Sequence, residues 1–231
     1  MKVVEKAAII YNFYYNVIYK LHYISKLNKF LQMLGFLLLA NQLYLIKMTN
    51  NNINYFLVVD LEATCCNDGS IPRRSMEIIE IGAVMLNGIT WETESEFQMF
   101  VQPVRHPKLT PFCTELTTIS QEDVDAALKF PEVMVSFSKW IDSFPNPIFC
   151  SWGDYDKNQF VQDCNFHHVP YPFGQEHKNI KKEFSKYLGT SEKFGMAQAL
   201  EHLGIILKGT HHRGIDDARN IAAIFRHMNL E

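Results

Sequence analysis

The sequence of 231 residues has no strong excess of charge of either sign, since 22 lysines and arginines stand against 25 acids for a net charge of -3. No overall basic field therefore attracts nucleic acid, although a local basic groove can coexist with an acidic site. Cysteine is also scarce, and the five residues are odd in number and lack metal-ligand spacing. They are Cys65, Cys66, Cys113, Cys150 and Cys164. This usage argues against a disulfide framework and predicts reduced thiols in a cytoplasmic protein.

Proline and acidic residues are nearly absent from residues 1–47, which contain no proline and one acid. Within them, residues 30–46 form an apolar stretch of 17 residues, at the lower limit of a membrane span, but Gln32, Asn41 and Gln42 interrupt it. No cleavage site of small residues follows, so a secretory signal fits poorly. Three interpretations of this N-terminal extension stay open: a start assigned too early, with Met48 as the natural beginning, an appended helix, or a weak membrane anchor. We favour the first and expect no stable membrane association.

Residues 48–231 form the second predicted domain, and they contain no internal repeat and no low-complexity linker. The run that starts at Tyr55 is apolar on both faces, as in a central strand, and Asn87-Gly88 is a hairpin signal. Ser120 and Asp123 resemble a capped helix start. The predicted strands are 55–61, 77–88, 94–103 and 147–153, and the predicted helices are 130–144, 156–168, 195–205 and 216–228. This order predicts an α/β fold, a mixed sheet with helices packed on its faces.

Two acids, Asp60 and Glu62, stand at the exit of the apolar strand. Side chains two apart on a strand point the same way, so both carboxylates share a face at the carboxyl end of a central strand, where open α/β sheets build their sites. A buried carboxylate is costly unless something positive meets it. Taken alone, such a pair is more often a solvated turn or a salt-bridge partner.

Two further acids strengthen the case for a site. Asp156 and Asp217 each stand in the first turn of a predicted helix, and Asp217 shares its face with the apolar Ile221 and Phe225. One acid at such a place usually complements the helix dipole, an effect of about 0.3–1 kcal/mol. That explanation does not account for an acid on a buried helix face. The alternative is that four carboxylates converge at one end of the sheet.

A cluster of four carboxylates requires a cation, because each pair at ~4 Å repels by roughly 4 kcal/mol at an effective dielectric of 20. Ligands that are all oxygen, with no cysteine or histidine in the primary set, favour Mg²⁺ or Mn²⁺ over zinc. Two such ions can clamp a phosphate, one activating water and the other stabilising the leaving oxygen. The acids therefore predict phosphodiester hydrolysis.

These residues resemble the DEDDh 3′–5′ exonucleases, which have a ribonuclease H-like fold, and most closely their Eri-type branch, which includes histone-mRNA exonucleases and bacterial relatives. The resemblance covers residues 55–229. It rests on motifs in the same order and spacing: "DLEATC" (60–65), "EIIEIGAV" (77–84), "FCTELTTISQEDVDAA" (112–127), "WGDYD" (152–156), "NIKKEF" (179–184) and "HHRGIDDARNIA" (211–222).

The resemblance implies a mixed sheet with helices on both faces, and two Mg²⁺ or Mn²⁺ ions. The implied metal ligands are Asp60, Glu62, Asp156 and Asp217. The implied catalytic residues are His212, as the general base, and Glu62. Two alternatives stay open, because Asp154 competes with Asp156 and His211 competes with His212. The chain also departs from the branch at Thr117-Thr118-Ile119, where Thr-Gly-Ile is frequent.

Contacts to substrate are harder to assign from the sequence. Backbone groups of Ala63 and Thr64 lie beside the expected ligands, where a 3′-terminal nucleotide would bind. Met76, and either Trp152 or Tyr155, are candidates for stacking on terminal bases, with core packing as the alternative. Candidate phosphate contacts are Lys181 and Lys182 within the basic run that also contains Lys178 and Lys186, and Arg73-Arg74, with a solvated surface as the alternative.

The function that these features predict is that of a Mg²⁺-dependent 3′–5′ exonuclease. We expect it to act on single-stranded RNA or DNA 3′ ends, RNA more readily than DNA, and to release nucleoside 5′-monophosphates. The main alternative is a non-catalytic nucleic-acid-binding module of the same fold. A hydrolase that uses a carboxylate pair without metal is a third possibility, and insensitivity to EDTA would identify it.

Overall fold

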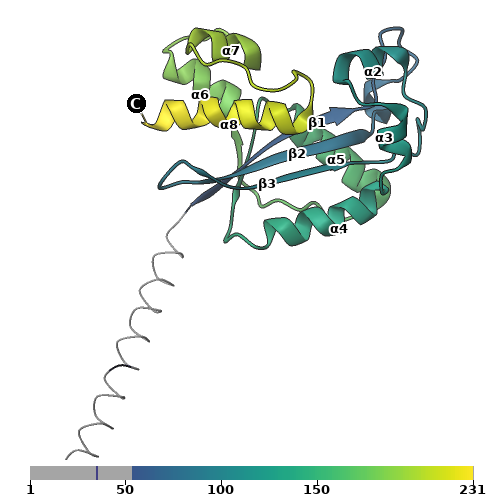
Figure 1. Ribbon diagram of the computed structural model, residues 1–231, viewed down its shortest axis with the longest axis horizontal. Helices are drawn as coiled ribbons and strands as arrows, with labels where there is room; N and C mark the ends of the chain where they lie inside the picture. The colour runs from purple at the N-terminus through teal and green to yellow at the C-terminus, as the bar shows by residue number, and fades with distance from the viewer. Residues whose placement is uncertain (1–34, 36–53, 231) are drawn as a thin grey trace, which may run out of the picture. The chain divides into compact units, whose positions relative to one another are not determined.

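The computed structural model describes Gly35 and residues 54–230 (Figure 1). The predicted extension, residues 1–47, lies outside the described residues apart from Gly35, and so do the three interpretations of it. No helix within the described part of the chain is both long and apolar enough to cross a membrane.

A mixed sheet forms the centre of residues 54–230, with five strands in the order β3-β2-β1-β4-β5. The strands are β1 (Tyr55–Ala63), β2 (Ile78–Asn87), β3 (Thr93–Phe100), β4 (Ile148–Ser151) and β5 (His177–Asn179). β1 pairs antiparallel with β2 and parallel with β4, so it is the central strand. Its position explains why its sequence is apolar on both faces.

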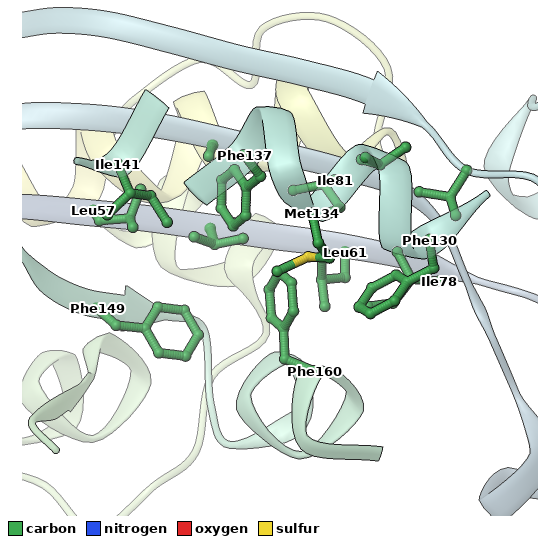
Figure 2. Close-up of a cluster of buried hydrophobic side chains, with 14 of the residues drawn as sticks. Leu57, Leu61, Ile78, Ile81, Phe130, Met134, Phe137, Ile141, Phe149 and Phe160 are labelled. Atoms are coloured by element: carbon green, nitrogen blue, oxygen red, sulfur yellow. The ribbon is translucent and has the colours of Figure 1, made fainter. Parts of the chain in front are cut away.

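Helices cover both faces of this sheet (Figure 1). Leu57 and Leu61 of β1 belong to an apolar cluster shared with α4 (Phe130–Ile141) and α5 (Tyr155–His167), where Phe137 and Phe160 are fully buried (Figure 2). Val58, on the other face, belongs to a second cluster shared with α6 (Ile180–Tyr187), α7 (Met196–His202) and α8 (Gly214–Leu230). The prediction of an α/β fold, a mixed sheet with helices on both faces, is therefore confirmed.

Three details differ from the sequence prediction. β5 was not predicted, because His177, Lys178 and Asn179 have no apolar alternation; they pair with the free edge of β4. The strand predicted at 94–103 ends at Phe100, and beyond it the Gln102 amide donates to the Leu128 carbonyl, in the segment just before α4. A short helix, α2 (Pro111–Thr117), precedes the capped helix α3 (Gln121–Asp125). The capping box of Ser120 and Asp123 is present as predicted.

Thr118 ends α2 in the left-handed region, with φ of 59° and ψ of 9°. It stands at the point where the Eri-type branch frequently has glycine. A β-branched residue is strained in this conformation because its Cβ approaches the following carbonyl oxygen, a cost of about 1–2 kcal/mol. The threonine therefore stores strain at the end of a helix that packs beside the β1 exit, through its buried Cys113 against Cys65.

Replacing Thr118 by glycine should raise the free energy of unfolding by about 1 kcal/mol, because glycine adopts positive φ without a Cβ clash. Chemical denaturation of the variant and the wild type measures this difference. Thr117→Gly is the matched control and should lose stability, since the buried Thr117 hydroxyl donates to the Cys113 carbonyl at 2.8 Å. A Thr118→Gly variant less stable than the wild type would contradict the assigned strain.

Candidate active site

The hairpin register of β1 and β2 sets the position of the last helix. Asp60 pairs with Gly82, and the first residue of α8, Gly214, lies directly over them. A Cβ added at Gly82 would lie 2.0 Å from the Gly214 carbonyl carbon. The absence of a side chain at Gly82 is therefore what allows α8 to begin against the carboxyl end of β1, where it brings in Asp217.

Three carboxylates gather at this place. Asp60, Glu62 and Asp217 each offer an oxygen that lies within 4.8 Å of the others. Asp60 and Glu62 share one face of β1, as the two-residue period predicts, and Asp217 comes from the first turn of α8. The three acids are therefore close enough to act on one ligand.

Asp156 is the fourth acid of the cluster. It is buried in the first turn of α5, and its Oδ1 accepts the backbone amide of Leu61 at 3.1 Å, between the two acids of β1. Its rival Asp154 faces elsewhere: its side chain is 50% exposed, and its oxygens accept from Asn179 at 2.9 Å and from the Lys182 ammonium at 3.1 Å. The structure thus groups Asp156, and not Asp154, with the acids of β1.

Burial raises the pKa values of all four acids, and repulsion by neighbouring acids adds to it at Asp60 and Glu62. Burial, followed by the charge of Asp156 and then of Glu62, raises the pKa of Asp60 well above its usual range. Burial, followed by Asp217, raises the pKa of Glu62 to about 9, and burial raises the pKa of Asp156 to about 7. Burial also raises the pKa of Asp217. A set of carboxylates that repel one another suits a hard, oxygen-seeking cation such as Mg²⁺ or Mn²⁺.

Both histidines of the predicted pair lie beside Asp217. The His211 Nδ1 is 2.9 Å from the Asp217 Oδ2, and the backbone amide of His212 donates to the same oxygen at 3.0 Å. Their rings stack with centroids 4.0 Å apart. Burial, followed by His211, lowers the pKa of His212. A neutral imidazole able to accept a proton therefore adjoins the acid cluster.

Glu80 is a buried acid whose role the sequence did not reveal. It stands opposite Glu62 on β2 and is fully buried. Its carboxylate accepts from the Arg213 Nε at 3.1 Å, from the Gly214 amide at 3.0 Å and from Gln98 at 3.1 Å. Glu80 therefore fixes the segment that follows His212. An acid inside the apolar run 77–84 indicates a buried carboxylate that needs a partner. The sequence does not identify that partner, because Arg213 is 133 residues away.

The residues predicted to contact substrate already make contacts within the domain. The Thr64 amide donates to the Glu77 carbonyl, and the Thr64 hydroxyl accepts the Glu77 amide. The Ala63 carbonyl accepts from the Cys113 thiol at 3.7 Å. The Met76 carbonyl accepts from three side chains of the domain. Trp152 donates to the Phe194 carbonyl and packs in a core cluster, as the alternative of core packing foresees.

Two basic grooves meet at Asp154, which lines both of them. The larger has a volume of about 730 Å³ and is lined by Lys181 and Lys182, together with Lys186 and Lys193. The smaller, about 450 Å³, is lined by Arg73, Arg74, Asp154, Tyr155, Asn158, Gln159 and Gln162. Tyr155 directly precedes Asp156. Both grooves carry a local positive charge that the net charge of the chain does not reveal.

Comparisons with known proteins agree with this geometry. The RNase_T model, described as an exonuclease, matches residues 57–225. ERI1 exoribonuclease 3 of Homo sapiens is 37% identical over 195 residues, which are 81% of this chain and 57% of that protein. The probable 3′-5′ exonuclease KapD of Bacillus subtilis is 31% identical over 180 residues, 78% of this chain and 85% of that protein. The chain thus spans little more than half the length of the human relative.

A solved structure is similar as well. The nuclease domain of 3′hExo, a DEDDh family member, bound to rAMP, is 32% identical with a TM-score of 0.70, over 77% of this chain and 92% of that chain. A complex in which a 3′-exonuclease recognises the histone mRNA stem-loop is 31% identical with a TM-score of 0.71, over 77% of this chain and 64% of that chain.

Divalent metal should bind the native state and raise its melting temperature by mass action. With millimolar Mn²⁺ we expect a clear upward shift for the wild type, most of which Asp154→Asn retains and Asp156→Asn loses, because only Asp156 joins the acid cluster. Thermal denaturation with Mn²⁺ and with EDTA measures the shift for each variant. An unchanged wild-type melting temperature would count against a shared site, and the reverse order of the variants would make Asp154 the ligand.

Proposed function

Because the chain belongs to the RNase_T exonuclease family, we propose that it is a metal-dependent 3′–5′ exonuclease. It removes nucleotides from single-stranded 3′ ends, RNA more readily than DNA, and releases nucleoside 5′-monophosphates. The observation that carries this proposal is the convergence of four acids and a histidine-bearing loop at the carboxyl end of β1. A module that only binds nucleic acid gains nothing from acids that repel one another.

Two divalent ions, Mg²⁺ or Mn²⁺, are assigned to Asp60, Glu62, Asp156 and Asp217. When bound, such ions activate water and neutralise charge at the phosphate. The protein contributes a fixed set of oxygens: β1 sets Asp60 and Glu62 side by side, and the Leu61 amide orients Asp156. The pKa values of these acids, raised by burial and repulsion, mean that protons compete with metal for the same oxygens.

His212 is assigned as the general base that accepts a proton from the attacking water. Burial and His211 lower its pKa, so the imidazole is neutral near neutral pH and free to accept that proton. The Asp217 oxygen that accepts the His212 amide holds the backbone of this residue in place. Asp217 is thus assigned two roles: it binds metal, and it holds the backbone of His212.

The phosphates of the strand are assigned to the basic grooves, with Lys181 and Lys182 on one side of Asp154 and Arg73 and Arg74 on the other. Such contacts supply affinity without reading sequence. Lys182 also holds Asp154, so Lys181 is the freer of the two cations.

The terminal nucleotide is assigned to the surface beside Glu62. Ala63 and Thr64 remain candidate neighbours through their position in sequence, and Met76 through Gln159, which holds its carbonyl and lines the smaller groove. Trp152 is the weakest of the predicted contacts, since its ring packs against Phe184. The preference for RNA rests on the relatives that are named exoribonucleases and on the rAMP-bound 3′hExo domain.

Digestion of single-stranded oligonucleotides labelled at the 5′ end tests the proposal. With Mg²⁺ or Mn²⁺ the RNA should shorten stepwise from its 3′ end and DNA of the same sequence more slowly, and EDTA should stop both reactions. Binding without shortening would favour the non-catalytic module. Shortening that is insensitive to EDTA would point to a carboxylate-pair hydrolase, and faster loss of DNA would reverse the assigned preference.

His212→Ala should lower kcat by ~10²–10⁴-fold, the usual worth of a positioned base. Metal-induced stabilisation and oligonucleotide affinity should change little, because the proposed role of the imidazole is proton transfer. Single-turnover kinetics and binding titrations on the same preparation separate these effects. His211→Ala is the matched control. If it abolishes turnover while His212→Ala stays within threefold of wild type, the base is His211.

A further inference from the structure

His211 accepts no proton in the proposed mechanism, although its imidazole adjoins the active site. Its side chain is 41% exposed, and its Nδ1 lies 2.9 Å from the Asp217 Oδ2. The sequence therefore puts two consecutive histidines beside a buried carboxylate, and the mechanism above uses one of them.

Asp217 belongs to two groups of ligand atoms. One is the acid group with Asp60 and Glu62, and the other consists of His211, His212 and Asp217, whose ligand atoms also all lie within 4.8 Å of one another. The first group offers oxygen alone. The second offers two imidazole nitrogens and one carboxylate oxygen, a set that suits zinc, with one position left open.

The ligand atoms of the second group lie at separations near those of a zinc site. Zinc holds nitrogen at about 2.0–2.1 Å and carboxylate oxygen at about 2.0–2.2 Å, so ligand atoms around one tetrahedral ion lie roughly 3.4 Å apart. The three atoms therefore need to approach one another by at most about 1.4 Å from the separations present here. The two imidazole rings stack with centroids 4.0 Å apart, so at least one ring has to turn before both nitrogens face the same ion. The exposed His211 side chain can turn without displacing the backbone, which is held by hydrogen bonds that the His212 and Gly214 amides donate to Asp217 and Glu80.

We propose that His211, His212 and Asp217 form a zinc site that overlaps the active site. Occupation by Zn²⁺ takes away an acid that the Mg²⁺ or Mn²⁺ cluster requires and engages the imidazole assigned as the base. Zn²⁺ therefore inhibits the enzyme, and the part of the inference that concerns inhibition rests on the proposed function. The zinc site itself rests on the three side chains alone.

His211 determines whether this site exists. Without it, one imidazole and one carboxylate remain, and two ligands hold zinc weakly. Even partners outside the ligand shell typically change metal affinity by about 10–100-fold. Removing a direct ligand should therefore weaken zinc binding by at least about tenfold.

The alternative is that His211 only orients the Asp217 carboxylate through its hydrogen bond. In that case the His211→Asn variant would have a weaker Mn²⁺-induced stabilisation and an unchanged affinity for zinc. The zinc site makes the opposite prediction, since His211 touches none of the oxygens of Asp60 and Glu62 that complete the acid cluster.

Calorimetric titration of the metal-free full chain with zinc chloride tests the proposal directly. Wild-type protein should bind one Zn²⁺ that His211→Asn binds at least about tenfold more weakly. His168→Asn is the matched control, because His168 is exposed at the far end of α5, about 18 Å of helix from Asp156. It should bind zinc like the wild type, and asparagine is suited to the left-handed conformation of that residue.

Co²⁺ serves as a spectroscopic probe of the ligands, since thiolate ligands add a strong charge-transfer band that histidine and carboxylate ligands lack. The wild-type spectrum should show no thiolate band and should lose intensity in His211→Asn. In parallel, oligonucleotide hydrolysis in Mg²⁺ should require at least about tenfold more Zn²⁺ for half-inhibition in His211→Asn than in wild type.

Equal zinc affinity of His211→Asn and wild type would overturn the site, and so would a thiolate band that the variant retains. If zinc binding depends on His211 but the protein has no nuclease activity, the zinc site is supported and only the proposed function is refuted. Zinc that binds through His211 without slowing hydrolysis would refute the overlap of the two sites.

Discussion

Repulsion between carboxylates that share a buried place is the constraint on which the rest of this structure depends. Burial raises the pKa values of Asp60, Glu62, Asp156 and Asp217, and at Asp60 and Glu62 the charges of the neighbouring acids raise them further. Other buried acids of the domain are paired: Glu80 with Arg213, and Asp163 with Arg105 at 3.1 Å. Within residues 54–230 no lysine or arginine forms a salt bridge with the four clustered acids, and this contrast supports the proposal that a bound metal neutralises them.

The backbone provides the means to bring these acids together. β1 is central and apolar, so its carboxyl end is a rigid place for Asp60 and Glu62. Gly82 lets α8 begin in contact with both strands, and Glu80 accepts the amide of its first residue, Gly214. The position of Asp217 therefore depends on the close approach of two glycines, Gly82 and Gly214, and on the buried carboxylate of Glu80. A site that must hold ions within fractions of an ångström benefits from such supports.

Asp217 is the residue that the two proposed metal-binding groups share. Its carboxylate faces the acids of β1 and also the imidazole of His211 and the amide of His212. Oxygen ligands select one class of cation and nitrogen ligands another. In these proposals the metal that Asp217 binds depends on whether His211 takes part. Because Asp217 also accepts the His212 amide, binding of metal by Asp217 is coupled to the position of the proposed base.

The sequence alone determined the parts of the protein that follow from local rules. The two-residue period put Asp60 and Glu62 on one face, apolar patterns gave the central strand and the main helices, and the spaced motifs gave the family. Only the tertiary structure decided what depends on distant partners. It separated Asp156 from Asp154 through the Leu61 amide and Lys182, and it linked Glu80 to Arg213 across 133 residues. It formed β5 from polar residues at an open edge, and it set both His211 and His212 against Asp217. The physical reason is that residue period and motif spacing can be read from neighbouring positions in the sequence. Hydrogen bonds and ion pairs between distant residues depend on the folded chain.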